Sequence, residues 1–282
     1  MRFSCRKRIF VSRDLNTTNK MWSIQQQSGD PRLFKGGADF GIPSAAELQF
    51  WKQIETDIRP NDTFQLVQSE FGLFLINPVD GVNRHIADGK FWDSFLLYYY
   101  DKYLTPESVF LDIGAFIGSH TVYCAKKCHH VYCFEPQRTI FFQLCANLYL
   151  NYCQNVHPFN VGLYDKEVKM CALDVDYSTF QFSASLAFNE KTLSKNMAIF
   201  KTLDSFNFQK VDFIKIDAEC CDYNVLVGGI ETIKKFRPYI CFEKNEGTIT
   251  KYVEFFDKIN YKIKLIVGDV DYFAAPAERA DF

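Results

Sequence analysis

From residue 109 onward the chain alternates short β-rich runs with longer stretches of helical periodicity. The β-rich runs cover residues 109–113, 131–135, 211–216 and 239–243, and the helical stretches lie near 117–127, 137–151 and 222–235. Strands that alternate with helices are joined by right-handed crossovers, which builds a mainly parallel sheet covered by helices on both faces. The sequence therefore predicts an α/β fold with a twisted, mainly parallel sheet.

Further segments extend this fold at both ends. Residues 64–78 alternate apolar and polar side chains, which predicts a β-hairpin, and residues 90–104 carry apolar residues at helical spacing. Residues 261–267 and 271–275 are expected to be closing strands, for which an antiparallel arrangement is one option. Within the helix near 137–151, one apolar stripe is predicted to be core: Phe141, Leu144, Cys145, Leu148 and Tyr152.

Residues 1–60 differ from the rest because they are polar and irregular, with one short helix expected near 45–54. We therefore predict an N-terminal arm or cap (1–60) and one large domain (61–282). Within that domain the hairpin and helix of 61–105 would cap a core of 106–282.

Composition restricts the partners and the compartment. A formal net charge of -2 argues against broad electrostatic binding to nucleic acid, which needs a basic face. No signal peptide is expected at the N-terminus, and no apolar run approaches the ~20 residues of a membrane helix. The ten cysteines are scattered through predicted core elements, which indicates free thiols in a reducing compartment such as the cytoplasm.

The turn after the first core strand indicates which ligand the sheet binds. In the run VFLDIGAFIG, Asp112 ends the strand, and Gly114, Ala115 and Gly118 follow. A dinucleotide fingerprint would have glycine where Phe116 stands, so a pyrophosphate would meet a bulky side chain. An acid at the strand end would repel phosphate but suits a cation. S-adenosylmethionine carries both an ammonium and a sulfonium, so it is the favoured ligand.

The second core strand ends in Glu135, followed by Pro136. A carboxylate there can accept both hydroxyls of a ribose, a role shared by folds that bind NAD and S-adenosylmethionine. The alternative is a charge in the first turn of the next helix. Asn160, Val161 and Gly162 are expected near the adenine. This interpretation requires Asp112 and Glu135 to face one common cleft.

The stretch VDFIKIDAECCD places three acids after a buried strand: Asp217, Glu219 and Asp222. Strand alternation points Lys215 and Asp217 to the same side. Crowded carboxylates raise each other's pKa, so Asp217 or Glu219 could take the proton of an alcohol during methyl transfer. The same three acids could instead hold Mg²⁺, or at least one of them could cap the helix that follows.

Taken together, the motifs resemble the FkbM-type methyltransferases. The shared motifs are D-x-G-A-x-x-G at 112–118, F-E-P at 134–136, N-L-x-L-N at 147–151, I-D-x-E at 216–219 and F-E at 242–243. The resemblance implies a Rossmann-like class I methyltransferase that uses S-adenosylmethionine and methylates hydroxyls, commonly of sugars. It also implies that Asp112, Gly114 and Gly118 hold the methionyl part of the cofactor. Glu135 would hold the ribose, and Asp217 and Glu219 would face the transfer site.

Two positions depart from that family. Cys220-Cys221 follows the I-D-x-E acid, where the family usually has glycine, so either the turn needs no positive φ here or the substrate approaches differently. Phe116 stands where the family favours asparagine, which removes a polar contact to the cofactor.

Other interpretations stay open. His120, Cys124 and Cys128 share one helix face and could bind zinc, although no paired C-x-x-C motif is present. His120 could also be a base, or a capping or surface residue, and His85 could line an acceptor pocket. That pocket is expected from 60–105, 174–200 and the loop after 243, with Tyr98, Tyr177 and Phe182 as candidate stacking residues. An NAD-dependent oxidoreductase and a non-catalytic scaffold are the competing functions.

Overall fold

The computed structural model describes residues 64–172, 188–189, 197–244, 248–268 and 270–282. The arm at 1–60 and the predicted helix near 45–54 lie outside the described residues, as do Tyr177 and Phe182. In chain order the elements are β1 (Gln65–Gln68), β2 (Leu73–Ile76), α2 (Gly81–Ala87), α3 (Leu96–Tyr103), β3 (Val109–Ile113), α4 (Ser119–Ala125), β4 (His130–Phe134), α5 (Arg138–Leu150), β5 (Val156–Phe159), β6 (Gly162–Leu163), β7 (Val168–Ala172), β8 (Phe188–Asn189), β9 (Met197–Lys201), the 3-10 helix η2 (Leu203–Phe206), β10 (Phe213–Ile216), α6 (Asp222–Gly228), α7 (Ile230–Phe236), β11 (Tyr239–Glu243), α8 (Ile249–Lys258), β12 (Tyr261–Val267) and β13 (Asp271–Pro276).

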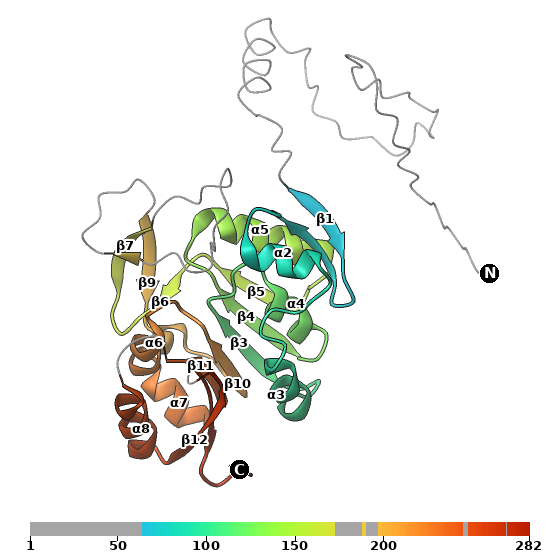
Figure 1. Ribbon diagram of the computed structural model, residues 1–282. Helices are drawn as coiled ribbons and strands as arrows, with labels where there is room; N and C mark the ends of the chain where they lie inside the picture. Colours follow the sequence, from blue (N-terminus) through green and yellow to red (C-terminus); the bar gives the residue numbers. More distant parts are fainter. Residues whose placement is uncertain (1–63, 173–187, 190–196, 245–247, 269) are drawn as a thin grey trace, which may run out of the picture. The chain divides into compact units, whose positions relative to one another are not determined.

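A seven-stranded sheet forms the centre of the domain, in the order β12-β13-β11-β10-β3-β4-β5 (Figure 1). β3, β4, β5, β10 and β11 pair in parallel, and β13 runs antiparallel to both of its neighbours. The mainly parallel sheet is therefore confirmed, and the two closing strands are antiparallel. Because β3 lies between β10 and β4 and is parallel to both, the carboxyl ends of these three strands meet at one edge of the sheet.

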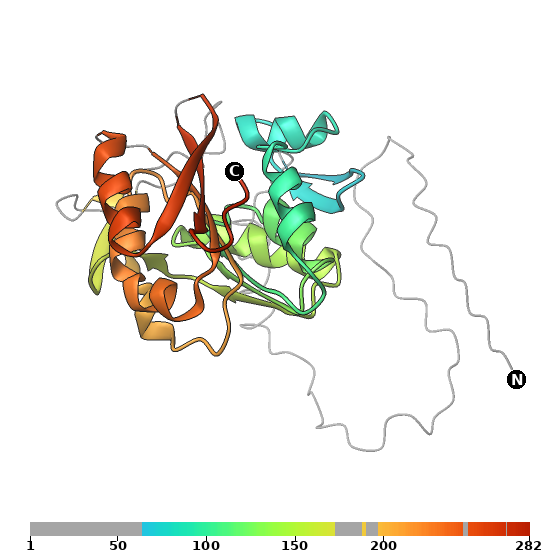
Figure 2. The same cartoon turned by 90° about the horizontal axis from the view of Figure 1, so that it is seen from below.

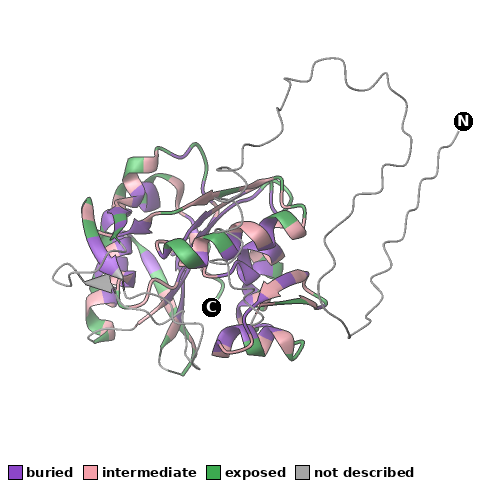
Figure 3. Ribbon diagram, turned by 90° about the horizontal axis from the view of Figure 1, so that it is seen from above, coloured by how far each residue is buried: buried purple, intermediate pink, exposed green. Residues whose placement is uncertain are grey.

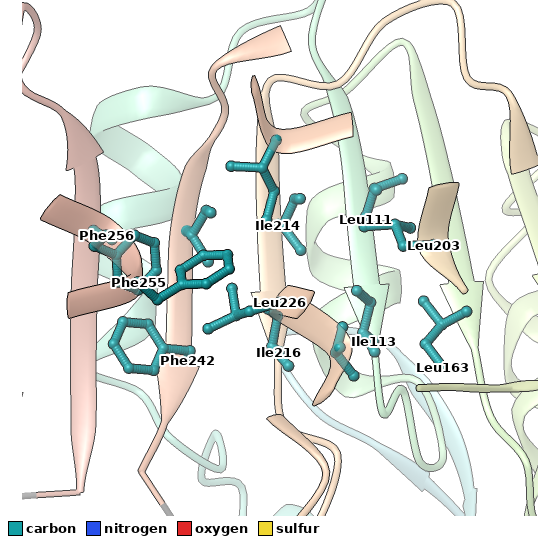
Figure 4. Packing of buried hydrophobic residues seen from close by; sticks show 14 of the residues in the cluster. Leu111, Ile113, Leu163, Leu203, Ile214, Ile216, Leu226, Phe242, Phe255 and Phe256 are labelled. Carbon is teal, nitrogen blue, oxygen red and sulfur yellow. The ribbon is translucent and has the colours of Figure 1, made fainter. Parts of the chain in front are cut away.

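Helices cover both faces of this sheet (Figure 2). On one face, alternate residues of β3, β10 and β11 pack against α6, α7 and α8, in a cluster that includes Ile214, Leu226 and Phe256 (Figure 4). On the other face, Phe110 and Phe213 pack against α3 and α4. The helices bury their inner sides and expose their outer sides, as expected for amphipathic helices around a two-sided sheet (Figure 3).

The predicted hairpin is β1–β2, and asparagines of α5 hold it in place. Asn151 bonds the main chain of Leu73 twice, through Oδ1 to the N–H at 2.9 Å and through Nδ2 to the carbonyl oxygen at 2.7 Å. Asn147 Oδ1 accepts the N–H of Leu75 at 2.7 Å. The two asparagines of the N-L-x-L-N motif therefore serve as partners for an edge strand.

This arrangement corrects the predicted apolar stripe of α5. The buried residues of the helix are Ile140, Gln143, Leu144, Asn147 and Leu148. Tyr152 is 85% exposed, so it is not core. The inward face is rotated because polar side chains with main-chain partners can be buried without loss.

Two further predictions about elements are corrected, and one additional sheet is present. The stretch 222–235 is broken at Gly228-Gly229 into α6 and α7, since glycine is a poor helix former. The helix expected at 90–104 begins only at Leu96. A second, four-stranded sheet, β6-β9-β7-β8, was not predicted.

Within the described residues, no helix combines the length and apolar character needed to cross a bilayer.

Candidate active site

A cavity opens at the edge where β3, β4 and β10 end. It is lined by Ile113, Gly114, Phe116, Phe134, Glu135, Pro136, Gln137, Ile140, Gly162, Leu163, Phe200, Asp217, Ala218 and Glu219. Aromatic and aliphatic side chains form most of this wall, and carboxylates come from the ends of β4 and β10. An apolar pocket with a few converging polar groups is the usual form of a small-molecule site.

Gly114 allows the first loop to lie against the loop after β10. Its φ is +76°, and a Cβ built there would collide with the carbonyl oxygen of Asp217. At Gly118, where φ is +88°, a Cβ would collide with Leu144. The sequence analysis expected a ligand to lie against these two glycines, whereas in the structure the space beside them is filled by Asp217 and Leu144. The glycines thus bring the cavity walls together.

Glu135 is the buried acid of the cavity wall. Its Oε2 accepts the N–H of Phe116 at 3.0 Å, and its Oε1 accepts the N–H of Gln137 at 2.7 Å. Burial raises its pKa to about 8, although these two N–H groups act in the opposite direction. Because a carboxylate has about four lone-pair sites, Glu135 can bind the loop and still accept bonds from hydroxyl groups.

Asp112 does not reach the cavity. It is fully buried, where Oδ2 accepts the hydroxyl of Thr121 and Oδ1 lies 3.7 Å from Nζ of Lys215. The expectation that Asp112 and Glu135 both line one cleft is therefore wrong for Asp112. The two strands are adjacent, but Asp112 pairs with Cys133, two positions before Glu135, so its side chain lies within the sheet beside Thr121 of α4 and not at the strand end.

Lys215 is a buried cation that the sequence interpretation did not assign to the site. It is 3% exposed, and its Nζ donates to Oδ2 of Asp217 at 3.0 Å and to the carbonyl oxygen of Gly114 at 3.3 Å. Burial alone would lower its pKa, but the charges of Asp217 and Asp112 raise it above the usual range. The ammonium is therefore charged at neutral pH.

The three acids after β10 do not share one role. Asp217 and Glu219 line the cavity, whereas Asp222 is buried at the start of α6. Its Oδ1 accepts the N–H of Ala218 at 3.5 Å, and burial raises its pKa to about 7. Asp222 therefore stabilises the turn before the helix and does not cap the helix, since the N-cap position is Cys221 and no side chain caps it.

The same turn holds two non-glycine residues in the left-handed region. Glu219 has φ +40° and Cys220 has φ +67°. The turn thus needs positive φ here, and the alternative that it does not is wrong. Such a conformation costs an L-residue about 1–2 kcal/mol, and strain of this kind is concentrated at functional sites.

A second, smaller hollow lies beside the cavity and shares Asp217 with it. Four acids line this hollow, Asp93, Asp217, Glu243 and Asp271, together with Lys215. Burial, followed by the charge of Asp217, raises the pKa of Asp93 to about 7 and that of Asp271 to about 6. Asp93 lies within the 60–105 segment that was expected to contribute to an acceptor pocket, and Asp271 begins β13, but neither acid was among the named candidates.

Comparison with known proteins bears on this geometry. The methyltransferase FkbM domain family matches residues 112–264, which is more than half of the chain. The chain belongs to the FkbM methyltransferase family. The match begins at Asp112 and includes all the acids of the cavity wall. This FkbM domain has a Rossmann-like α/β fold with a mainly parallel sheet.

Solved structures similar to this FkbM domain include the following three proteins. Methyltransferase FkbM from Methylobacillus flagellatus KT is 16% identical, with a TM-score of 0.45, and the match covers 63% of this chain and 50% of that chain. An rRNA methylase from Streptococcus thermophilus is 14% identical, with a TM-score of 0.40 and coverage of 63% and 89%. TYW2 of M. jannaschii, solved in complex with AdoMet, is 14% identical, with a TM-score of 0.37 and coverage of 77% and 86%.

The match spans only half the length of the Methylobacillus protein. A search of curated proteins finds no match.

Metal binding finds no support in the FkbM domain. Within the described ranges, no group of three or more histidine, cysteine, aspartate or glutamate side chains is arranged to hold a metal ion. Neither Asp217, Glu219 and Asp222, considered as a magnesium site, nor the His120 cluster, considered as a zinc site, forms such a group. The nine cysteines of the described part are free thiols.

The remaining predicted residues are not among those that line the cavity. Asn160 donates to the carbonyl oxygens of Glu135 and Pro136, at 2.8 and 3.1 Å, and so ties two loops together. Ala115 is buried beneath the first loop. His85 packs edge-on against Trp92, and Tyr98 is 61% exposed.

His120 is core and not surface. It is 5% exposed, its Nδ1 lies 3.1 Å from the hydroxyl of Tyr100, and its ring packs edge-on against Phe91. Burial lowers its pKa well below the usual range. A neutral imidazole enclosed by aromatic rings has no access to a substrate, so His120 is not a candidate base.

Proposed function

We propose that this FkbM domain is an S-adenosylmethionine-dependent O-methyltransferase whose acceptor is a hydroxyl group of a sugar or glycan. The cofactor supplies an electrophilic methyl group on a positively charged sulfur. The residues that would hold it are Gly114, Glu135, Pro136 and Gly162 at the cavity wall, with Glu135 toward the ribose hydroxyls. The apolar walls fit a nucleoside, and the buried carboxyl of Glu135 lies at the same wall.

The observation that carries the proposal is the position of Asp217. Its carboxylate is the polar group shared by the cavity and the acid-lined hollow. Lys215 occupies Oδ2 of Asp217, and within the described residues Oδ1 accepts no hydrogen bond. That oxygen can accept the proton of an alcohol that approaches from the hollow. General-base assistance of this kind typically contributes about 10²–10⁴-fold.

The acids of the hollow support a sugar as the acceptor. Sugar hydroxyls are hydrogen-bond donors, and Asp93 and Asp271 in the hollow carry acceptor oxygens. The FkbM resemblance also favours sugars. The net charge of -2 speaks against a nucleic acid acceptor, so RNA serves as the contrasting substrate in the test.

Calorimetry with S-adenosylhomocysteine, and with NAD as control, tests the cofactor assignment. We expect the former to bind and NAD not to bind. Absence of both would indicate a non-catalytic scaffold, and binding of NAD alone an oxidoreductase.

Transfer of a labelled methyl group from S-adenosylmethionine to monosaccharides, oligosaccharides and RNA then tests the reaction. We expect D217N to lower kcat about 100-fold or more with little change in affinity for S-adenosylhomocysteine, because the base acts only in the chemical step. E219Q is the matched control within the same turn and should lower kcat less. A D217N variant as active as the parent would remove Asp217 as the base.

We also propose that the protein works in a reducing compartment, with the cytoplasm as the simplest choice. The free thiols of the described part support this, since five of the nine are buried and none of the nine forms a disulfide. Fractionation of cells expressing the full chain tests the proposal, and recovery in a secreted fraction would contradict it.

A further inference from the structure

We infer that Lys215 is a positioning residue that acts through Asp217, a role that rests on the methyl transfer proposed above. The ammonium group joins the two loops that form the floor of the cavity. It bonds the carbonyl oxygen of Gly114 on the loop after β3 and the carboxylate of Asp217 on the loop after β10. Both loops line the cavity, but Lys215 itself lines only the hollow on the other side of Asp217.

The position of Lys215 is fixed by the register of the sheet. It pairs with Asp112 on β3 and with Cys241 on β11, so its side chain leaves the sheet on the same face as these two residues. A buried lysine is costly unless carboxylates surround it. Asp112 on one side and Asp217 on the other supply this environment, at 3.7 and 3.0 Å from Nζ.

The consequence concerns the orientation of Asp217. Because Lys215 holds Oδ2, the second oxygen of the carboxylate is directed away from the ammonium. Asp112 is fully buried and Asp93 and Asp271 carry carboxyls nearby, so without the cation Asp217 would stand among acids alone. Lys215 therefore supplies the counter-charge that keeps this carboxylate in place and links its position to the Gly114 loop.

A double-mutant cycle separates this role from a merely structural one. We expect K215M to lower kcat about 100-fold and to weaken S-adenosylhomocysteine binding about fivefold, since the Gly114 loop loses a bond. If Lys215 acts through Asp217, K215M should lower kcat no further in the D217N background. Effects that multiply to about 10⁴-fold would overturn the inference.

Two variants serve as controls for this experiment. K210M removes a lysine that precedes the same strand and pairs with Asp212 at 3.1 Å on the surface, and it should leave both readouts unchanged. K215R keeps the charge, so it should recover about tenfold in kcat relative to K215M. If K215M does not fold, K215R replaces it in the double-mutant cycle. The inference would be overturned if K215R lowered kcat by the same factor in the D217N variant as in the unaltered chain.

The two proposals fail in different ways. If the unaltered chain binds S-adenosylhomocysteine but methylates none of the acceptors, the proposed reaction fails, and the binding readout still tests Lys215. K215M binding as tightly as the unaltered chain would then overturn the inference alone. No binding of S-adenosylhomocysteine by the unaltered chain would overturn both.

Discussion

The carboxyl group of Glu135 is fixed at the cavity wall by the N–H groups of Phe116 and Gln137. We predict that E135Q weakens binding of S-adenosylhomocysteine, because glutamine has one acceptor oxygen and its NH₂ would face one of the two N–H donors. With its pKa raised to about 8, Glu135 is mostly neutral at pH 7, and a neutral hydrogen bond contributes about 0.5–1.5 kcal/mol, which corresponds to roughly 2- to 13-fold in affinity.

Calorimetry measures this affinity, and thermal unfolding confirms that the variant is folded. E167Q changes an exposed glutamate and should bind like the parent. Equal affinity of E135Q and the parent would remove the assignment of Glu135 to the ribose.

Cys220 adopts a φ of +67°, a conformation that glycine takes without cost. We predict that C220G raises the free energy of unfolding by about 1 kcal/mol, since it relieves the left-handed strain by more than the unfolded chain gains in entropy. C221G is the matched control, because Cys221 has φ -107° and should gain nothing.

Urea unfolding measures both cysteine variants. A C220G variant less stable than the parent would show that contacts of the cysteine side chain outweigh the strain.

At the scale of elements, the N-L-x-L-N motif anchors a hairpin that is far from it in sequence. We predict that N151A destabilises the β1–β2 hairpin by about 1–3 kcal/mol, because both the N–H and the carbonyl of Leu73 lose their partner. Hydrogen exchange should show faster exchange at Leu73 than in the parent, with little change in β10 or β11.

Y152A, next to the same helix end, serves as the control, since Tyr152 is 85% exposed. Unchanged protection of Leu73 in N151A would mean that packing of Phe74 and Ile76 alone holds the hairpin.

The same helix shows where element prediction fails. Apolar periodicity located α5 within one residue at each end but gave the wrong inward face. The periodic pattern counts apolar side chains only, whereas Gln143 and Asn147 are buried because β2 offers main-chain partners. A pattern within one helix contains no information about a strand some 70 residues away.

At the scale of the whole molecule, the acids at the sheet edge make stability depend on pH. Burial raises the pKa of Glu135 to about 8 and those of Asp93 and Asp222 to about 7. In unfolded chains these groups titrate near 4, so between pH 6.5 and 8 the folded chain binds more protons than the unfolded one. Stability therefore falls as pH rises through this window.

We predict a loss of roughly 2 kcal/mol or more in the free energy of unfolding from pH 6.5 to pH 8. The depressed pKa of His120 acts in the opposite direction, but mostly below pH 6.5, so it offsets only a small part of this loss. Urea unfolding at the two pH values measures the loss. E135Q should reduce it, and stability that is constant or rises over this range would contradict the prediction.

The sequence by itself determined the alternation of strands and helices, the mainly parallel sheet and the delivery of Glu135 and Asp217 to one edge. These features are local, because strand runs, helical periods and strand-end residues can be recognised within ten or so positions, and parallel strands bring their carboxyl ends together.

Only the tertiary structure decided how the side chains at that edge are used. Asp112 faces away from the cavity, Lys215 links two loops, and Asp93 and Asp271 join Asp217 in a hollow. Each of these contacts joins residues from different strands or loops. They depend on strand order, register and the face to which each side chain points, which packing of the whole domain sets.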